Sequence, residues 1–174
     1  MVEDLKENGW GLRRAAIQDS SLLADLIAVS FHDVATRFGL GRDNCPSHPS
    51  LITSDRVERG FRLGTEFLLA FQGTCPCGCV GLRRPVEGVS TLEKLAVAPA
   101  FRRQGLGRIL VRQALSVAQR AGAMRVEIGI IARQQELRAW YESLGFRAVR
   151  NAQFEQLPFE VLFLQKTLGG GPEA

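Results

Sequence analysis

The segment from Leu95 to Arg108 constrains the possible folds more than any other part of the chain. It reads Leu-Ala-Val-Ala-Pro-Ala-Phe-Arg-Arg-Gln-Gly-Leu-Gly-Arg, a short apolar strand pattern that ends at Pro99 and leads through a turn into a Gly-x-Gly. Apolar residues then recur at helical spacing to about Ala121, and the apolar run Met124–Ile131 predicts a buried strand. A strand, a helix and a second strand in this order predict a right-handed parallel crossover, and therefore a fold that mixes α and β structure.

The start of this helix is a candidate anion site. The first N–H groups of a helix have no intrahelical partner, and the helix dipole adds positive potential at that end. Gly105 and Gly107 would let the backbone approach a ligand closely, while Arg102, Arg103 and Arg108 add positive charge. A surface turn with a solvated arginine cluster is the alternative interpretation.

Two common phosphate-binding fingerprints are absent from this segment. The dinucleotide-binding Gly-x-Gly-x-x-Gly would need Gly or Ala where Leu110 stands, and no Gly-Lys-Ser/Thr follows as in a Walker loop. Residues 1–60 carry 7 positive and 9 negative side chains, whereas residues 61–174 carry 15 and 9. This asymmetry indicates an anionic ligand on the C-terminal part, either nucleic acid or a phosphate-bearing cofactor. Aromatic residues do not interleave with arginine as they do in single-strand binders.

Hydrophobic periodicity and turn residues divide the chain into the elements of one domain. Its 174 residues, 45% of them apolar, are enough for a single core. The expected fold class is α/β, with a mixed central sheet of about seven strands flanked by four helices. Residues 1–9 are expected to form an N-terminal extension, 10–167 the domain and 168–174 a flexible tail. The predicted strands cover residues 10–17, 66–71, 79–83, 91–98, 124–131, 146–150 and 159–164, and the predicted helices cover 20–38, 54–63, 105–121 and 134–144.

Three of the four cysteines lie in the run Cys75-Pro-Cys-Gly-Cys79, and the fourth is Cys45. A metal clip completed by Cys45 or His48 is disfavoured, because structural zinc sites usually contain C-x2-C pairs. We expect no metal, and a tight turn at Cys-Pro-Cys-Gly that brings Cys75 and Cys79 to face each other between two strands.

Residues 102–107, Arg-Arg-Gln-Gly-Leu-Gly, resemble the Arg/Gln-x-x-Gly-x-Gly/Ala motif of the GNAT acetyltransferases, which cradles the pyrophosphate of coenzyme A. The preceding Leu95–Pro99 looks like the bulged fourth strand of that family, and Trp140–Phe146 is similar to its Tyr-x-x-x-Gly-Phe element. The resemblance covers about residues 10–167 and is most specific over 91–147. The segments 44–50 and 157–161 also resemble a bacterial branch of the family, which implies no substrate.

The resemblance implies a GNAT fold, N-acetyltransferase activity and acetyl-CoA as the co-substrate. In that family, backbone groups of the bulged strand bind the pantetheine arm and the thioester carbonyl, and Leu95 and Val97 occupy the matching positions. Where the family often has an Asn that helps to hold the pantetheine, this chain has Gln134. The implied coenzyme-binding residues are Leu95, Ala96, Val97, Arg102, Arg103, Gln104, Gly105, Leu106, Gly107, Arg108 and Gln134.

Acetyl transfer requires that the amine lose a proton, that the thioester oxygen be stabilised and that the leaving thiolate be protonated. The resemblance makes Tyr141, the only tyrosine, the candidate general acid, with a backbone N–H near Val97 as the oxyanion donor. Glu93 is the candidate base, because it precedes Leu95 by two residues and lies on the same face of a regular strand. The alternatives are a core aromatic for Tyr141 and an ion-paired residue for Glu93.

The acceptor amine, a small molecule or a peptide, is expected at the first two predicted helices and the loop between them. His32 and His48 are alternative bases there, although each is more typical of a helix surface or a loop. Four acidic residues of this region would favour a cationic amine: Asp33, Asp43, Asp55 and Glu58.

Three other functions compete with acetyl transfer. They are an acyl-CoA-binding module without turnover, a transferase for longer acyl groups and, least expected, a nucleic-acid-binding protein. A homodimer is left open. No apolar stretch approaches the ~20 residues that span a bilayer, and Met1–Glu7 lacks the pattern of a signal peptide. We therefore expect a cytoplasmic location without a membrane partner.

Overall fold

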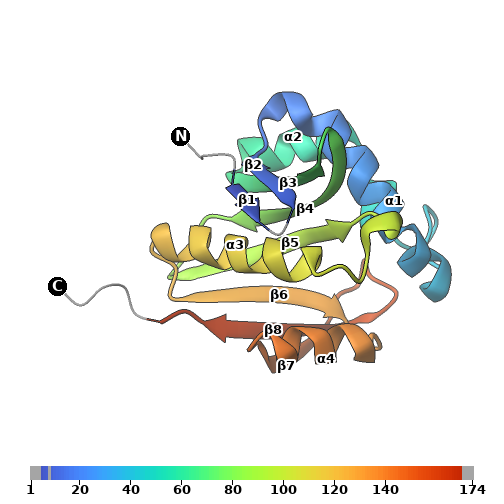
Figure 1. The fold of residues 1–174 in the computed structure, drawn as a ribbon. Coiled ribbons are helices and arrows are strands. Elements are labelled where there is room, and N and C mark those ends of the chain that lie inside the picture. Colours follow the sequence, from blue (N-terminus) through green and yellow to red (C-terminus); the bar gives the residue numbers. More distant parts are fainter. Residues whose placement is uncertain (1–4, 8, 170–174) are drawn as a thin grey trace.

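The computed structural model describes residues 5–7 and 9–169, and shows a mixed sheet with four helices packed against it (Figure 1). Three short 3-10 turns also occur, at Ile17–Asp19, Pro49–Leu51 and Pro99–Phe101. The main elements are β1 (Leu5–Glu7), β2 (Trp10–Arg14), α1 (Ser20–Phe38), α2 (Ser54–Arg62), β3 (Thr65–Gln72), β4 (Cys75–Arg83), β5 (Val89–Val97), α3 (Leu106–Arg120), β6 (Arg125–Ile131), α4 (Gln135–Ser143), β7 (Arg147–Gln153) and β8 (Glu160–Thr167).

The strands follow the order β1-β2-β3-β4-β5-β6-β8-β7 across the sheet. Neighbours are antiparallel except β5 and β6, which are parallel and joined by α3. The predicted α/β fold and the predicted parallel crossover are therefore confirmed. The described sheet has eight strands where about seven were predicted, because β1, within the predicted extension at 1–9, pairs with β2. Residues 1–4 and 8 of that extension, and 170–174 of the predicted tail, lie outside the described residues.

Two hydrophobic cores cover the two faces of the sheet. Side chains alternate between the faces of a strand, so Phe67 of β3 joins the core beneath α1 and α2, with Ile27. The neighbouring Leu68 joins the other core, beneath α3 and α4, with Leu110 and Tyr141. We call these two sides the α1 face and the α3 face.

A β-bulge interrupts β5. Glu93 and Ala96 are three residues apart on β5, whereas their partners Gly81 and Cys79 are only two apart on β4. The strand accommodates the extra residue at Lys94, whose φ of 50° lies in the left-handed region that is uncommon for residues other than glycine. Bulges of this kind bend the strand and increase its twist.

The bulge places Glu93 and Leu95 on different faces of the sheet. A Cβ added to Gly81, the partner of Glu93, would lie 2.9 Å from Phe67 on the α1 face. Leu95 instead packs against the core of the α3 face. The prediction that both side chains share a face is therefore wrong, because alternation does not continue through an inserted residue.

The predicted turn at Cys-Pro-Cys-Gly is also wrong. Gln72 pairs with Cys75, so the hairpin turns at the two residues between them, where Gly73 has a φ of 60°. The cysteine run lies within β4, and Cys75 and Cys79 share one strand instead of facing each other. All four thiols are free. In residues 9–169 we find no cluster of metal-ligating side chains and no helix long and apolar enough to span a bilayer.

Gly78 lies where β4 closely approaches both β5 and α3. A Cβ at this position would lie 2.8 Å from the carbonyl oxygen of Ala96 and 3.1 Å from Leu110. We expect Gly78→Ala to lower the free energy of unfolding by about 1–3 kcal/mol in urea denaturation, the usual cost of overpacking. The control is Gly41→Ala, where an added Cβ meets no atom within 4 Å and stability should hold or rise slightly. Equal effects of the two substitutions would contradict this close packing.

Candidate active site

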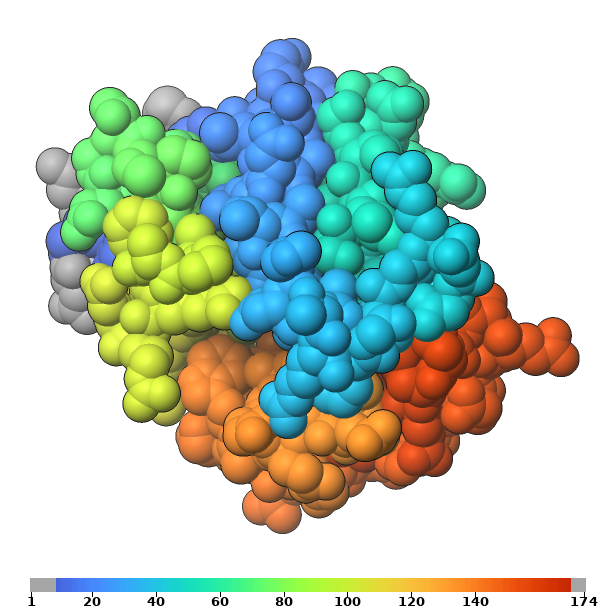
Figure 2. All heavy atoms as spheres, turned by 90° about the vertical axis from the view of Figure 1, so that its right-hand side faces the viewer, coloured from blue at the N-terminus to red at the C-terminus, as the bar shows by residue number. Residues whose placement is uncertain are grey.

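β5 and β6 are paired only near their amino-terminal ends. Their register runs from Val89 and Arg125 to Thr91 and Glu127, and the strands then diverge (Figure 1). A cleft of about 760 Å³ opens between their carboxyl ends, the edge of an α/β sheet where ligands usually bind. Because the sheet is split there, residues from both faces line one cleft. Figure 2 views the molecule from this edge, with the segment around residues 40–50, in cyan, crossing in front.

The turn before α3 exposes backbone N–H groups on the α3 side of the cleft. Arg103 and Gly105 have φ values of 61° and 84°, and the N–H of Ile109 is the one that bonds the carbonyl of Gly105. The N–H groups of residues 106–108, in the first turn of α3, have no acceptor within the helix. A Cβ on Gly105 would meet no atom within 4 Å, so the space beside it is open. With the exposed side chains of Arg103 and Arg108, this turn forms an anion cradle.

The last residues of β5 present unpaired backbone groups to the cleft. The N–H of Ala98 bonds the carbonyl of Cys77 at 2.8 Å and therefore points toward β4. Backbone groups alternate in direction along a strand, so those of Leu95 and Val97 point toward β6. Since β6 has diverged, they have no strand partner. The carbonyl of Val97 accepts a hydrogen bond from Arg102 Nε, and the N–H of Val97 and both backbone groups of Leu95 are available to an extended ligand.

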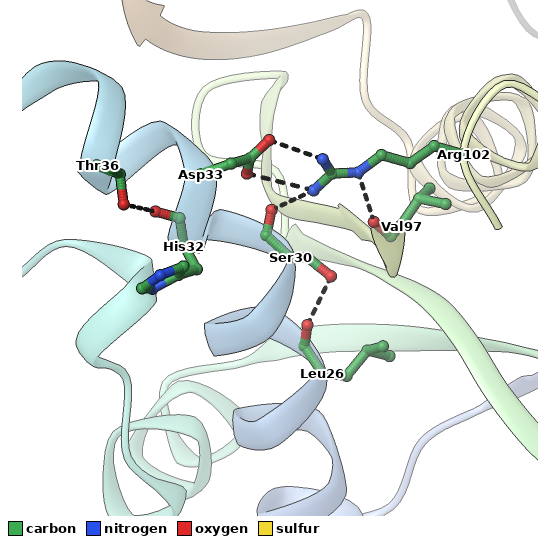
Figure 3. A network of polar contacts seen from close by, with 7 residues as sticks. All are labelled: Leu26, Ser30, His32, Asp33, Thr36, Val97 and Arg102. Carbon is green, nitrogen blue, oxygen red and sulfur yellow. Dashed lines mark hydrogen bonds and ion pairs between the residues drawn. The ribbon is translucent and has the colours of Figure 1, made fainter. Parts of the chain in front are cut away.

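Arg102 connects this turn to α1 on the opposite face of the sheet (Figure 3). Its Nη1 donates to Asp33 Oδ2 at 2.7 Å, its Nη2 donates to the carbonyl of Ser30 at 2.7 Å, and its Nε donates to the carbonyl of Val97 at 3.2 Å. The guanidinium lowers the pKa of the Asp33 carboxyl mainly by hydrogen bonding to it. Arg102 thus braces the mouth of the cleft, and four of its five N–H donors bond protein oxygens.

Tyr141 enters the cleft from α4. Its ring is packed against Trp140 and Phe146, with ring centroids 4.8 Å and 5.5 Å away. Burial raises the pKa of Tyr141 well above its ordinary value, so the phenol keeps its proton at neutral pH. The ring serves the core, as the alternative interpretation held, and it also lines the cleft.

Glu93 lines the cleft from the α1 face. One carboxylate oxygen accepts a hydrogen bond from Lys94 Nζ at 2.8 Å, and the other pairs with Arg83 Nε at 2.8 Å. A carboxylate has about four lone-pair positions, so two ion pairs leave room for a water molecule or an amine. Glu93 is therefore ion-paired, as the alternative interpretation held, and it also lines the cleft.

The segment between α1 and α2 is held by its own hydrogen bonds. Asn44 accepts from the N–H of Gly41 and donates to the carbonyl of Gly39, each at 2.8 Å. The Arg56 guanidinium donates to the carbonyls of Pro46 and Ser47, each at 3.1 Å. The segment is rich in glycine, proline and serine, yet these bonds give it one defined path over the cleft.

His48 is the buried polar residue of this segment. Its Nδ1 accepts the N–H of Ser50 at 3.2 Å and lies 2.8 Å from the Ser50 hydroxyl. The ring stands edge-on to Phe31, 6.1 Å away, and lines the cleft. Burial lowers the pKa of His48, so the ring is neutral at pH 7. Since Nδ1 accepts, the proton of the neutral ring resides on Nε2.

A family of known proteins matches this chain. The model of the Acetyltransferase (GNAT) family matches residues 35–146. The chain belongs to the GNAT acetyltransferase family. Acetyl-CoA is the acetyl donor of this family. No protein of curated function matches the sequence.

Solved structures of GNAT proteins share the fold at low sequence identity. A GNAT acetyltransferase from Staphylococcus aureus Mu50 superposes with a TM-score of 0.70 at 19% identity, covering 92% of this chain and 99% of its own. The ribosomal-protein-S18-alanine N-acetyltransferase of Escherichia coli gives 0.70 at 16%, covering 94% and 97%. The PaiA N-acetyltransferase of Thermoplasma acidophilum, in complex with coenzyme A, gives 0.69 at 15%, covering 91% and 99%.

The cleft of this GNAT protein fits coenzyme A in shape and charge. The open space beside Gly105 and the unpaired N–H groups of the first turn of α3 suit a pyrophosphate. The unpaired backbone edge at Leu95 and Val97 suits the amides of a pantetheine arm, which can pair as a strand would. A Cβ added to Gly107 would lie 3.4 Å from the indole of Trp140 and would narrow the cleft between them.

The structure brings nearly all the predicted site residues of this GNAT chain to one cleft. Gln104 is the exception, because its exposed side chain donates to the carbonyl of Ala100. Of the four acidic residues expected at the acceptor, only Asp33 lines the cleft. The lining residues that were predicted are Glu93, Leu95, Ala96, Val97, Arg102, Arg103, Gly105, Leu106, Gly107, Arg108, Gln134 and Tyr141.

Sequence reasoning missed several residues of the cleft. Trp140 lines the cleft, but it was predicted only as part of the motif that contains Tyr141. Its large aromatic side chain, which packs beside the glycine-containing start of α3, was a signal that could have identified it. Arg56 and Phe159 also line the cleft. Arg56 lies on a predicted helix and Phe159 at the start of a predicted strand, but nothing in the sequence alone places either residue beside β5.

Gly105 and Gly122 make a matched pair at the two ends of α3. Their φ values are 84° and 85°, and a Cβ on either would meet no atom within 4 Å. We expect Gly105→Ala and Gly122→Ala to cost similar folding stability, roughly 1–2 kcal/mol for the left-handed conformation. Calorimetry with coenzyme A should find weaker binding for Gly105→Ala alone, since only that site adjoins the cradle. Equal affinities would place the pyrophosphate elsewhere.

The burial of His48 predicts a pH dependence of stability. Its folded-state pKa is below the ordinary value of 6.5, so below that pH the unfolded chain binds a proton that the folded protein does not. The free energy of unfolding should therefore fall as pH decreases from about 7.5 to about 5. His48→Gln should remove part of this fall in urea denaturation, whereas His32→Gln on the exposed surface of α1 serves as the control. An unchanged pH profile for His48→Gln would contradict the burial of a neutral ring.

Proposed function

We propose that this protein transfers an acetyl group directly from acetyl-CoA to an amine acceptor. The observation that carries the proposal is the split sheet, because one cleft connects the α3 face, with its anion cradle, to the α1 face. A donor and an acceptor that enter from the two faces can meet at the gap without a covalent enzyme intermediate. We take residues 10–167 as the catalytic domain.

On the α3 face, the chain supplies the binding groups for the coenzyme. The N–H groups at the start of α3, with Arg103 and Arg108, bind the pyrophosphate. The backbone edge of β5 at Leu95 and Val97 orients the pantetheine arm, and the N–H of Val97 donates to the thioester oxygen as it becomes negative. Acetyl-CoA itself supplies the acetyl group as a thioester. The energy of these contacts positions the reacting carbon within the gap.

Tyr141 acts as the general acid on the α3 face. Its buried phenol lines the cleft and keeps its proton at neutral pH, because desolvation disfavours the phenolate. A thiolate that leaves beside this hydroxyl can take up the proton. No other residue of the chain is a tyrosine, so no second phenol can replace it.

Glu93 acts as the base on the α1 face, directly or through a water molecule. Lys94 and Arg83 fix its carboxylate, and the bulge turns it away from the face that holds Leu95. The acid and the base thus stand on opposite sides of the gap, as transfer between two ligands requires. The primary test is a screen of amines with acetyl-CoA that measures free thiol, in which no acceptor-dependent release would contradict the proposal.

Tyr141→Phe tests the general acid. The substitution keeps the ring and its packing, so folding stability and coenzyme affinity should stay close to those of the wild type. We expect kcat to fall by roughly 10²-fold or more where chemistry limits the rate. Thiol release with the best acceptor of the screen measures kcat, and an acyl donor with a more acidic thiol should restore part of the loss. If Tyr141→Phe keeps the wild-type kcat where chemistry limits the rate, the proton that the leaving thiolate takes up comes from water and not from Tyr141.

A further inference from the structure

The charges on the α1 face of the cleft do not match a polycationic acceptor. Both carboxylates that line the cleft are already paired, Asp33 with Arg102 and Glu93 with Lys94 and Arg83. Asp43, Asp55 and Glu58, which were expected to attract a cationic amine, do not line it. A polyamine would therefore bring several charges to a wall that has no unpaired anion for them.

Arg56 supplies the opposite charge at this wall. Its guanidinium lines the cleft and donates to the carbonyls of Pro46 and Ser47, directly before His48. No ion pair joins it to a carboxylate in residues 9–169. Two of its five N–H donors are used in these bonds, and the others remain for a ligand.

His48 adds a hydrogen-bond donor beside Arg56. Its Nδ1 accepts the N–H of Ser50, so Nε2 carries the proton. Nε2 bonds no described side chain, and it is not one of the two unpartnered atoms that are sealed from solvent, which belong to Glu66 and Ser90. Since His48 lines the cleft, its Nε2–H is available as a donor to an oxygen of the ligand.

The remaining wall at this end of the cleft is apolar. It comes from α1, from the segment before α2, and from β8 and the chain leading into it, and it consists of Phe31, Val34, Ile52, Leu157, Phe159 and Val161. An acceptor that fits this surface carries an apolar body, an oxygen anion and one amine. The cation and the N–H at one corner favour a full carboxylate over the neutral carbonyl of a peptide bond.

We propose that the acceptor is a free α-amino acid with an apolar side chain, whose carboxylate is bound by the Nε2–H of His48 and the guanidinium of Arg56; this rests on the proposed acetyl transfer. The reaction forms a bond between the amino nitrogen and the acetyl carbon and breaks the carbon–sulfur bond of the thioester. The ammonium group gives up two protons, one to the departing sulfur and one to solvent.

The test compares acceptors that differ only in the carboxylate. Phenylalanine and leucine are paired with phenethylamine and 3-methylbutylamine, alongside the other standard amino acids, phenylalanine amide and spermidine, and thiol release is measured. We expect kcat/KM to be at least about tenfold higher for each amino acid than for its decarboxylated partner, the effect of one charge-assisted hydrogen bond. Equal rates for the pairs, or spermidine as the best acceptor, would overturn the proposal.

Variants of His48 test the donor itself. His48→Phe keeps a ring without an N–H, and His48→Gln keeps an N–H of similar reach, while both lose the Nδ1 bond to Ser50. We expect KM for phenylalanine to rise about tenfold in His48→Phe and to recover in part in His48→Gln. It should stay unchanged in the control His32→Phe, because His32, the other predicted base, is exposed on α1 and does not line the cleft. KM for phenethylamine should not change in any of them. An equal rise in KM for phenylalanine and phenethylamine would mean that His48 only holds the loop in place and does not bind the carboxylate.

Coenzyme binding distinguishes a failure of the amino-acid acceptor from a failure of acetyl transfer itself. If calorimetry detects no binding of acetyl-CoA to the wild-type protein, acetyl transfer itself is contradicted. If acetyl-CoA binds and no amino acid of the panel accepts the acetyl group, the amino-acid acceptor is wrong and the coenzyme site stands. Melting temperatures of the His48 variants identify any that fail to fold, and the comparison of acceptors on the wild-type protein does not depend on them.

Discussion

The inserted residue at Lys94 is the constraint on which the rest of the site depends. A regular β5 would continue its parallel pairing with β6 and close the sheet, and its Glu93 and Leu95 would point the same way. With the bulge, the strands part after Thr91, their backbone groups remain unpaired, and a gap crosses the sheet from face to face. The left-handed φ of a lysine costs energy, as backbone strain at functional sites usually does.

Arg102 ties the end of β5 to α1 at the mouth of the cleft. It lies in the turn that follows β5, and its guanidinium reaches across to Ser30 and Asp33 on α1. The two faces of the sheet are thereby joined at the mouth of the cleft by hydrogen bonds to a charged group, which are stronger than neutral ones. An arginine that a sequence motif assigns to phosphate has, in this chain, a bracing position, and Arg103 and Arg108 are left to face the anion.

The residues on the α3 side of the cleft could be predicted from the sequence because they lie close together in the chain. A strand, a turn and a Gly-x-Gly at a helix start are contiguous in the chain, and their geometry follows from backbone rules. The bulge was implied by family resemblance, but its effect on Glu93 was missed, because alternation was applied through the inserted residue. The cysteine turn was misplaced for a different reason. Proline and glycine usually mark turns, but the hairpin turns at Gly73, and Pro76 and Gly78 lie inside β4.

The α1 side of the cleft could not be predicted because it is assembled from distant segments. His48, Arg56 and Phe159 lie on a loop, a helix and the chain before β8, and only tertiary packing brings them to the cleft. The loop that carries His48 has the composition of a flexible connection, yet Asn44 and Arg56 hold it with side-chain hydrogen bonds. Such bonds depend on three-dimensional partners and leave no periodic signal in a sequence.

A crystal structure of the protein with coenzyme A tests the central claim most directly, through the distance between the coenzyme sulfur and the Tyr141 hydroxyl. We expect the pantetheine arm to lie along the edge of β5 at Leu95 and Val97, with the sulfur within hydrogen-bonding reach of that hydroxyl. A coenzyme bound outside the gap between β5 and β6, or a sulfur beyond the reach of Tyr141, would contradict it.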